Sequence, residues 1–426
     1  MRTKISLVLL FISSFVCGGW AQEKLSLTLE QARLHAQQYN RTLKNAGLSV
    51  KEAQSALWES ISKGLPQVQV SGTYTNYLGA SADFQGMKID FGQSGSMQTQ
   101  VNQLVFSGSY LVGLQLSKLS RQMAEISRRK TEQDVIQQVT NSYHSILVSE
   151  RTSQLLKQNK ENLLDVQKRT QATVNAGAAT QTDADQISVQ VSSVDNLIKS
   201  NERQTELAYN MLRIQLGVGA NTVIELKDSL GSLMNEEKTF RLLGEQFEME
   251  KNPSLQLTEQ QLQVAKKQVT LEKANWLPTI SGYYSYTYKY IKPQFDLNPS
   301  SVAGLQVSWP LFTSGGTSSK IKQAKFKVQE NENNLVALKD QLMVQERQAR
   351  FNLTNALEKL DTQTKTMNVS NRVFVDISRK HDHGMATSLD VTTASNNLIQ
   401  VQSNYLTALY EVLTAKTELE QLLNKF

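Results

Sequence analysis

Hydrophobic residues along the chain recur with two different periods, and the two periods alternate. Across residues 29–63, apolar residues and alanines return at helical spacing, and Gly64-Leu65-Pro66 then provides a helix stop. After Pro66 the apolar spacing becomes two residues, which is the period of a β-strand. The pattern therefore predicts a helix that leads into a strand.

The period of two is clearest in a hairpin predicted at residues 279–312. Its first strand alternates Ser, Thr and Lys with a mostly aromatic face formed by Ile280, Gly282, Tyr284, Tyr286, Tyr288 and Tyr290. Its second strand alternates in the same way through Leu305, Val307, Trp309 and Leu311. We expect residues 292–301 to form the loop between them, because this segment contains two prolines.

A weaker hairpin is predicted at residues 67–106. Its first strand is marked by Val68, Val70 and Tyr74, and its second strand lies within residues 97–106. A Gly- and Ser-rich segment at residues 78–96 is the expected loop.

After each hairpin, a helical pattern continues for longer than a globular core requires. Residues 109–176 and 318–383 contain no proline, and each segment would be about 100 Å long as an unbroken α-helix. Apolar residues in them are spaced three and four residues apart, as in Ile136, Val139, Tyr143 and Ile146. This spacing predicts long antiparallel coiled coils.

The chain also contains an internal duplication. Four landmarks occur twice in the same order, displaced by roughly 210 residues, which is hard to produce by chance. They are Asn-x-x-Leu at Asn40 and Asn252, Leu-Pro at Leu65 and Leu277, Phe before a glycine at Phe106 and Phe312, and Gly-x-Ala-Thr-x-x-Asp at Gly177 and Gly384. We therefore expect a first repeat at residues 22–216, a connecting equatorial segment at 217–250 and a second repeat at 251–426.

The N-terminus predicts export. Arg2 and Lys4 precede an apolar run at residues 5–16, and small residues end at Ala21, the order of a secretory signal peptide at residues 1–21. The single cysteine, Cys17, lies inside this signal, where the preceding Val16 makes a poor lipoprotein site. The processed chain would thus have neither disulfides nor thiolate metal sites.

The remaining chemistry points away from an enzyme and from nucleic acid. The net charge of +6 is mild, and no block of Lys and Arg occurs. Motifs such as Gly-x-Ser-x-Gly, His-Glu-x-x-His and a phosphate-binding Gly-rich loop do not occur in the sequence. His381 and His383 would point to different sides of a helix, so we expect a solvated helix end there and not a metal pair. We expect no cofactor and no bound metal.

Four strands are too few for a membrane barrel. An open sheet edge is not tolerated in lipid, so several chains would have to share one barrel. Two chains would give eight strands, whose interior fills with side chains, whereas three chains would give twelve strands around a water-filled lumen. The aromatic strand faces suit such a barrel.

The order of elements and motifs in this chain resembles the outer membrane efflux protein (TolC) family. That order, which occurs twice, is helix, Leu-Pro, hairpin, Phe-x-(x)-Gly, long helix, Gly-x5-Asp and helix. The opening Thr28-Leu29-Glu30-Gln31-Ala32 and the later Trp309-Pro310-Leu311-Phe312 also resemble family motifs. The resemblance implies a mainly α fold with a small β part, in which long helices form an α-barrel and two hairpins per chain build a trimeric, twelve-stranded membrane β-barrel.

The same resemblance implies a function and partners. The chain would be a subunit of an outer-membrane exit duct in a tripartite efflux or type I secretion system, with its helices in the periplasm. Its partners would be two further copies of itself, a periplasmic adaptor protein, an inner-membrane pump or ABC exporter, and outer-membrane lipid.

The two Gly-x5-Asp segments would then lie at the periplasmic tip, where the family's channel is gated and the adaptor docks. The glycines suit a left-handed helix end, the threonines suit the cap of the next helix, and the aspartates suit its first turn. Rings of these aspartates in a trimer would favour cations, although helix-start stabilisation alone is an equal alternative. The tip candidates are Gly177, Thr180, Asp183, His381, Gly384, Thr387 and Asp390. The expected membrane-interface aromatics are Tyr74, Tyr284, Tyr286, Tyr288, Tyr290 and Trp309.

This sequence departs from the family's best-known member at the second tip. Ala386 and Thr393 stand where that member has an arginine and a second aspartate, and His381 replaces a tyrosine. The particular contacts that lock that member's gate are therefore not expected here.

Two other classes of protein compete with a duct. A secreted coiled-coil structural protein or adhesin would explain the long helices but not two hairpins at matching positions. A periplasmic adaptor would show a single helical hairpin between β-rich domains.

Overall fold

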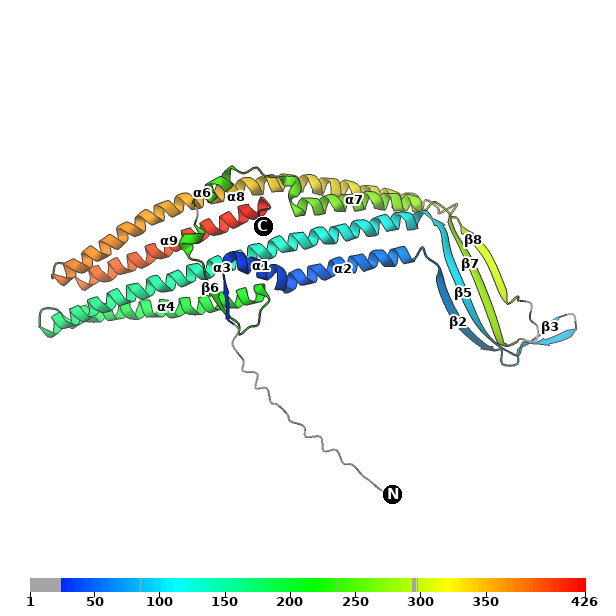
Figure 1. Ribbon diagram of the computed structural model, residues 1–426, viewed down its shortest axis with the longest axis horizontal. Helices are drawn as coiled ribbons and strands as arrows, with labels where there is room; N and C mark the ends of the chain where they lie inside the picture. The colour runs from blue at the N-terminus through cyan, green and yellow to red at the C-terminus, as the bar shows by residue number, and fades with distance from the viewer. Residues whose placement is uncertain (1–23, 85, 235, 293–295, 297) are drawn as a thin grey trace, which may run out of the picture.

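The computed structural model describes residues 24–426, apart from residues 85, 235, 293–295 and 297. The expected signal peptide at residues 1–21 lies outside the described residues. The chain is strongly elongated: the helices run lengthwise, the main sheet lies at one end, and two interhelical turns lie at the other (Figure 1). None of the helices in the described part combines the length and the apolar character needed to cross a bilayer.

Four long helices form two antiparallel pairs. In the first repeat, α3 (Gly108–Asn175, 68 residues) turns into α4 (Gln181–Leu216, 36 residues). In the second repeat, α8 (Gly316–Asp382, 67 residues) turns into α9 (Ser388–Leu422, 35 residues). The predicted long helices are thus confirmed. Their three-and-four spacing forms a buried stripe, because Val139, Tyr143 and Ile146 are fully buried.

Shorter helices extend each pair toward the sheet. Residues 29–63 do not form one helix, because the chain bends at Asn40 between α1 (Leu29–Tyr39) and α2 (Arg41–Ser62). The Asn40 side chain accepts a hydrogen bond from Leu43 N at 3.0 Å and so caps α2. Its amide also donates to the Gln215 carbonyl at 2.7 Å, which fixes the bend against α4. The counterpart in the second repeat is α7 (Pro253–Ala274), which is capped by Asn252.

The four principal strands form one antiparallel sheet in the order β2-β5-β7-β8. They are β2 (Gln67–Asn76), β5 (Gln93–Ser107), β7 (Thr279–Ile291) and β8 (Ser301–Ser308). The two predicted hairpins are therefore joined through β5 and β7, which leaves β2 and β8 as the outer strands of the described sheet (Figure 1).

Two details of the predicted hairpins were wrong. The loop at residues 78–96 contains a further small hairpin, β3 (Ser81–Phe84) and β4 (Met87–Asp90), and β5 begins before that loop was expected to end. Strand β8 ends at Ser308, so Trp309 and Leu311 lie beyond it. Pro310 cannot donate a backbone hydrogen bond to a sheet, which accounts for this end.

The segment between the repeats packs against the start of the described chain. β1 (Lys24–Leu27) pairs in parallel with β6 (Val223–Leu226), and α5 (Leu230–Leu233), α6 (Glu236–Gly244) and the 3₁₀ helix η1 (Met249–Lys251) follow. Leu27 and Ile224 join Tyr143, Leu212 and Leu216 in one hydrophobic cluster. Strand β6 is thereby fixed to the first helix pair, whereas Leu242 of α6 packs with Leu353 and Val412 of the second pair.

Candidate functional site

The turns α3–α4 and α8–α9 are built alike and lie at the end of the molecule away from the sheet (Figure 1). Gly177 and Gly384 have φ angles of 77° and 70°. After them, Ala178 N donates to Thr173 O at 3.0 Å, and Met385 N donates to Lys380 O at 2.8 Å. The left-handed helix ends expected at both glycines are confirmed, and a side chain with a Cβ would strain either position.

The next helix begins with a Thr–Asp pair in both turns. At the second turn, Asp390 accepts hydrogen bonds from Thr387 N at 2.8 Å and from Thr387 Oγ1 at 2.7 Å, and its own N–H donates back to Thr387 Oγ1 at 3.2 Å. At the first turn, Asp183 accepts from Thr180 N at 3.0 Å and from Thr180 Oγ1 at 2.6 Å. The expected helix-start roles are therefore confirmed for both aspartates and for Thr387, whereas the Thr180 side chain makes no cap hydrogen bond to the α4 backbone. The gate role of these residues stays a prediction.

Hydrogen bonding keeps both tip aspartates ionised. The Thr387 hydroxyl and N–H lower the pKa of Asp390, and the Thr180 hydroxyl and N–H lower the pKa of Asp183. Asp390 is exposed and Asp183 is partly exposed, so both can present negative charge to solvent. A cation near either turn would be attracted to the carboxylate there.

The two helix pairs share a core near the tip. Val166 of α3, Ile187 of α4, Phe374 of α8 and Val391 of α9 belong to one buried cluster. A partly buried hydrogen bond joins Gln190 Nε2 to Asn396 Oδ1 at 2.7 Å. The two turns are thus held by a common core.

Polar side chains also connect the two pairs. Arg169 Nη1 of α3 lies 2.6 Å from Asp382 Oδ2 of α8, and Asn159 Nδ2 donates to Gln402 Oε1 at 2.7 Å. Sequence reasoning missed both contacts, because their members lie in different repeats and no spacing rule relates them.

His381 differs from its expected solvated position, whereas His383 is exposed. The His381 Nε2 atom lies 3.3 Å from Ser388 Oγ, and its Nδ1 atom is buried with no hydrogen-bond partner among the described residues. Ser388 itself is 1% exposed. The solvated-end prediction is wrong for His381 because the start of α9 covers this side of α8.

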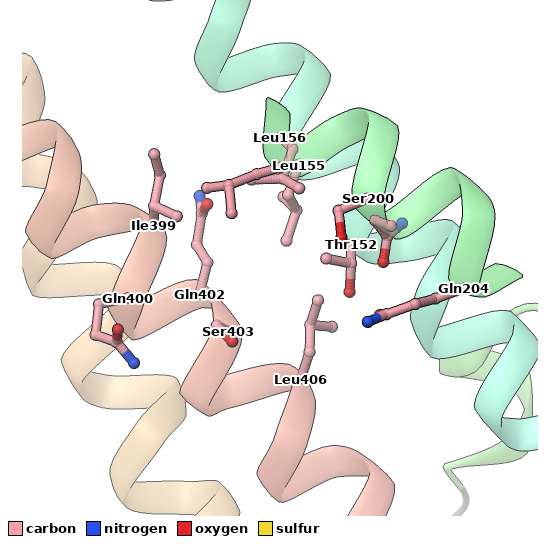
Figure 2. Close-up of a pocket in the computed structure, with 12 residues that line it drawn as sticks. Thr152, Leu155, Leu156, Ser200, Gln204, Ile399, Gln400, Gln402, Ser403 and Leu406 are labelled. Atoms are coloured by element: carbon pink, nitrogen blue, oxygen red, sulfur yellow. The ribbon is translucent and has the colours of Figure 1, made fainter. Parts of the chain in front are cut away.

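Farther from the tip, a cavity of about 330 Å³ lies between α3, α4 and α9. Figure 2 shows the side chains that line it. Its lining mixes Leu155, Ile399 and Leu406 with Thr152, Ser200, Gln204 and Gln402. The side chains that face this cavity do not form a continuous core. The packing between the helix pairs near the turns is therefore interrupted at the cavity. Beyond this cavity the pairs meet again, since Gln421 Nε2 of α9 donates to Asp134 Oδ1 of α3 at 3.0 Å.

The predicted interface aromatics lie at the sheet end. Tyr284, Tyr286, Tyr288 and Tyr290 are about half exposed on one face of β7, and Tyr74 is exposed on β2. This row extends for about 20 Å along the strand. Trp309 Nε1 donates to Trp276 O at 3.0 Å, and both indoles are exposed where the sheet meets the helices. Sequence reasoning missed Trp276, although it stands directly before Leu277-Pro278.

The architecture is that of an elongated channel-type subunit. It has duplicated helix pairs, a sheet with an apolar face at one end and capped turns at the other. Comparison with protein families matches residues 33–218 and 247–425 to the outer membrane efflux protein family. These two segments cover most of both repeats. The chain belongs to this family.

Individual relatives agree with the assignment. The chain is similar to the outer membrane efflux protein BepC of Brucella suis, with 22% identity over 92% of this chain and 84% of that protein. It is similar to the outer membrane protein TolC of Vibrio cholerae, with 20% identity over 91% of this chain and 89% of that protein. Its fold matches the Campylobacter jejuni CmeC outer membrane channel with a TM-score of 0.75, at 15% identity, over 93% and 85% of the two chains.

The family assignment confirms the predicted class of function and location. The protein is an outer-membrane exit duct for efflux, with helices that extend into the periplasm. Its family and fold are those of channels. The secreted adhesin and the adaptor are thereby disfavoured.

Proposed function

We propose that three copies of this chain form one continuous duct and that the two helical turns of each copy form its periplasmic gate. The observation that supports the trimer is the four-stranded sheet, whose outer strands β2 and β8 have no partner within the described chain. In lipid these strand edges require partners, and β2 of one copy pairing with β8 of the next would supply them. Three copies then give a twelve-stranded barrel with an open lumen.

The helices also carry apolar side chains that a single chain leaves exposed. They lie on α4 and α8, and each is more than half exposed: Val189, Leu207, Ile214, Phe326, Val344 and Phe351. Exposed apolar residues in such numbers favour further packing against protein. Neighbouring copies in a closed wall of helices would cover them.

The duct acts as a conduit and not as an enzyme. It receives its cargo through a periplasmic adaptor and an inner-membrane pump or ABC exporter, and cargo selection belongs to those partners. Membership of the efflux family supports this arrangement. The aromatic rows of β2 and β7, together with Trp276 and Trp309, favour a position of the sheet within the lipid bilayer.

The tip carries the gate because ionised carboxylates and the shared core meet there. Three copies would bring six carboxylates, from Asp183 and Asp390, to one end of the lumen. Rings of carboxylates at a constriction attract cations and hinder anions. The capping roles of both aspartates are compatible with this function, because Asp390 is exposed and Asp183 is partly exposed.

Conductance of the purified trimer in planar bilayers tests the proposal. Replacement of both tip aspartates by Asn (Asp183→Asn with Asp390→Asn) keeps an oxygen for the Thr hydrogen bonds and removes the charge. We expect a higher resting conductance and weaker block by divalent cations. Asp185→Asn is the matched control, since Asp185 is an exposed carboxylate on the same helix that accepts from Gln181 Nε2 at 2.9 Å.

Two results would oppose the proposal at different levels. A soluble monomer that is absent from the outer-membrane fraction would exclude the duct. A heat-modifiable trimer whose conductance and cation block do not respond to the double substitution would retain the duct and exclude the gate.

A further inference from the structure

The two helix pairs are built to one plan, so a residue of one pair has a counterpart at the equivalent position of the other. Gly177 and Gly384, which end the long helices of the two repeats, are counterparts. Asn175 and Asp382, the last residues of α3 and α8, are separated by the same number of positions as these glycines. A contact made by one pair therefore indicates which residues would make the equivalent contact at the other.

In the first pair, the surface formed by α3 and α4 near the tip is covered by α9 of the same chain. Val166 of α3 and Ile187 of α4 pack with Val391 of α9 in one buried cluster. Beside this cluster, Gln190 Nε2 of α4 donates to Asn396 Oδ1 of α9 at 2.7 Å. The first pair thus provides a surface that accepts α9.

The second pair has the counterpart of this surface, and there it is accessible. A groove of about 220 Å³ lies between α8 and α9 near the tip. Val373 of α8 lines it and is 46% exposed, whereas its counterpart Val166 is 2% exposed beneath α9. Three residues of the groove are counterparts of residues that α9 covers in the first pair: Val373 of Val166, Ala394 of Ile187 and Asn397 of Gln190.

Helix α4 is the counterpart of α9, and the side chains that correspond to the contacts of the second pair are accessible. Val189, the counterpart of Asn396, is 71% exposed, and Asn175, the counterpart of Asp382, is exposed as well. Among the described residues, those that line the groove belong to α8 and α9. A copy of α4 that reaches the groove must therefore come from a second chain.

We propose that α4 of one copy occupies the groove between α8 and α9 of the next copy, with Val189 against Val373 and Asn397. This inference rests on the proposed trimer and adds the surface through which neighbouring copies meet at the tip. Burial of the exposed Val189 side chain against Val373 removes apolar area of both residues from water. A head-to-tail contact of this kind generates a ring when its rotation closes.

A second contact follows from the ion pair between Arg169 and Asp382. The counterpart of Arg169 is Asp376 of α8, and the counterpart of Asp382 is Asn175 of α3. An asparagine amide can donate to a carboxylate, so Asn175 of one copy can bind Asp376 of the next. The contact between copies is thus a hydrogen bond where the contact within one chain is an ion pair.

Pairwise cysteine crosslinking of the full-length protein in outer-membrane fractions tests this inference. The processed chain would have no other cysteine, because Cys17 lies within the expected signal peptide. Val189→Cys with Asn397→Cys, treated with a short bis-maleimide, should give covalent dimers and trimers on a denaturing gel. Asn175→Cys with Asp376→Cys is a second pair with the same expectation. Each single variant should migrate as one chain.

Gln190→Cys with Asn396→Cys is the matched control. These residues are the sequence neighbours of Val189 and Asn397, and their side chains are joined within one chain by the hydrogen bond of 2.7 Å. The control pair should crosslink inside a chain and migrate as a monomer.

The outcomes separate this inference from the proposed duct. If the protein is a heat-modifiable trimer but neither test pair gives covalent oligomers, the duct stands and the inference is overturned. A covalent product that joins Asn397→Cys to a different protein would show that another partner fills the groove, which also overturns the inference. Absence of any trimer would overturn the proposed duct together with this contact.

Discussion

Arg169 of α3 and Asp382 of α8 form an ion pair of 2.6 Å between residues that lie 213 positions apart. Each residue is close to the end of the long helix in its repeat. Asp382 is about one-quarter exposed at its side chain, and Arg169 is about half exposed. The pair thus joins the two halves of the duplicated chain just above the two turns.

Arg169→Gln should loosen the tip without unfolding the chain. A partly exposed ion pair contributes about 0.2–1 kcal/mol, so the open-to-closed ratio should rise by roughly two- to fivefold. Single-channel recording at low ionic strength gives the clearest measurement, because salt screens the pair. Lys380→Gln is the control, since Lys380 pairs with Asp376 inside α8 and not between the helix pairs. Equal effects of both substitutions would show that general charge, and not this contact, controls the tip.

Asp228 connects the start of α1 to α3. Its Oδ2 atom accepts from Leu29 N at 2.6 Å and from the buried Tyr143 hydroxyl at 2.9 Å. Asp228→Ala should destabilise the protein by about 1–3 kcal/mol, because two donors lose a partly buried acceptor. Denaturant unfolding of the detergent-solubilised protein measures the change.

Asp361→Ala provides the comparison for Asp228. Asp361 pairs only with Lys365 along α8, and both side chains are largely exposed. Its removal should change stability by less than about 0.5 kcal/mol. If both alanine variants unfold at the same denaturant concentration, the contact at Asp228 does not stabilise the fold.

Local signals in the sequence predicted much of this structure. Gly177 and Gly384 end long helices with a left-handed residue, and Thr387 with Asp390 starts the next helix, all within one short motif. Alternation predicted β7 and proline predicted the helix ends. These features depend on neighbours in the chain, so their periods and cap residues are visible without the fold.

Contacts between distant segments could not be predicted in this way. β1 and β6 have four residues each and pair across most of the first repeat, with no local pattern to relate them. Ser388 follows a cap residue and looks like any helix-start serine, yet it contacts His381. The bend at Asn40, in contrast, had a local signal, because Asn-x-x-Leu is a helix-cap motif. The prediction of one helix over residues 29–63 relied on the continuous helical spacing and so missed this bend.

The buried His144 makes the stability of the helix pairs depend on pH. Burial, and then the charges of Arg33 and Lys416, lower the pKa of His144 from 6.5 to about 3. The unfolded chain binds this proton near pH 6.5 and the folded chain does not, so stability is present above pH 6.5 and falls as the pH decreases toward 3. The largest possible slope from one group is about 1.4 kcal/mol per pH unit.

His144→Leu should remove this part of the pH dependence. The variant would lose less apparent thermal stability than the wild type between about pH 6.5 and about pH 4.5, because it has no buried group to protonate on unfolding. His383→Asn changes an exposed histidine and should follow the wild-type curve. Parallel curves for the wild type and His144→Leu would show that His144 is protonated in the folded chain.

Gly217 offers a test of close backbone packing at the junction of α1, α2 and α4. Its φ angle is 74°, and a Cβ there would lie 2.3 Å from the Tyr39 carbonyl oxygen. Gly177 has nearly the same φ, 77°, but a Cβ at Gly177 would meet no described atom within 4 Å, so Gly177→Ala carries the strain of a positive φ alone. We expect about 1–2 kcal/mol for Gly177→Ala and about 2–5 kcal/mol for Gly217→Ala, measured by denaturant unfolding. If the two variants lose equal stability, the approach of Gly217 to Tyr39 imposes no constraint, and the bend at Asn40 is held by its side-chain hydrogen bonds alone.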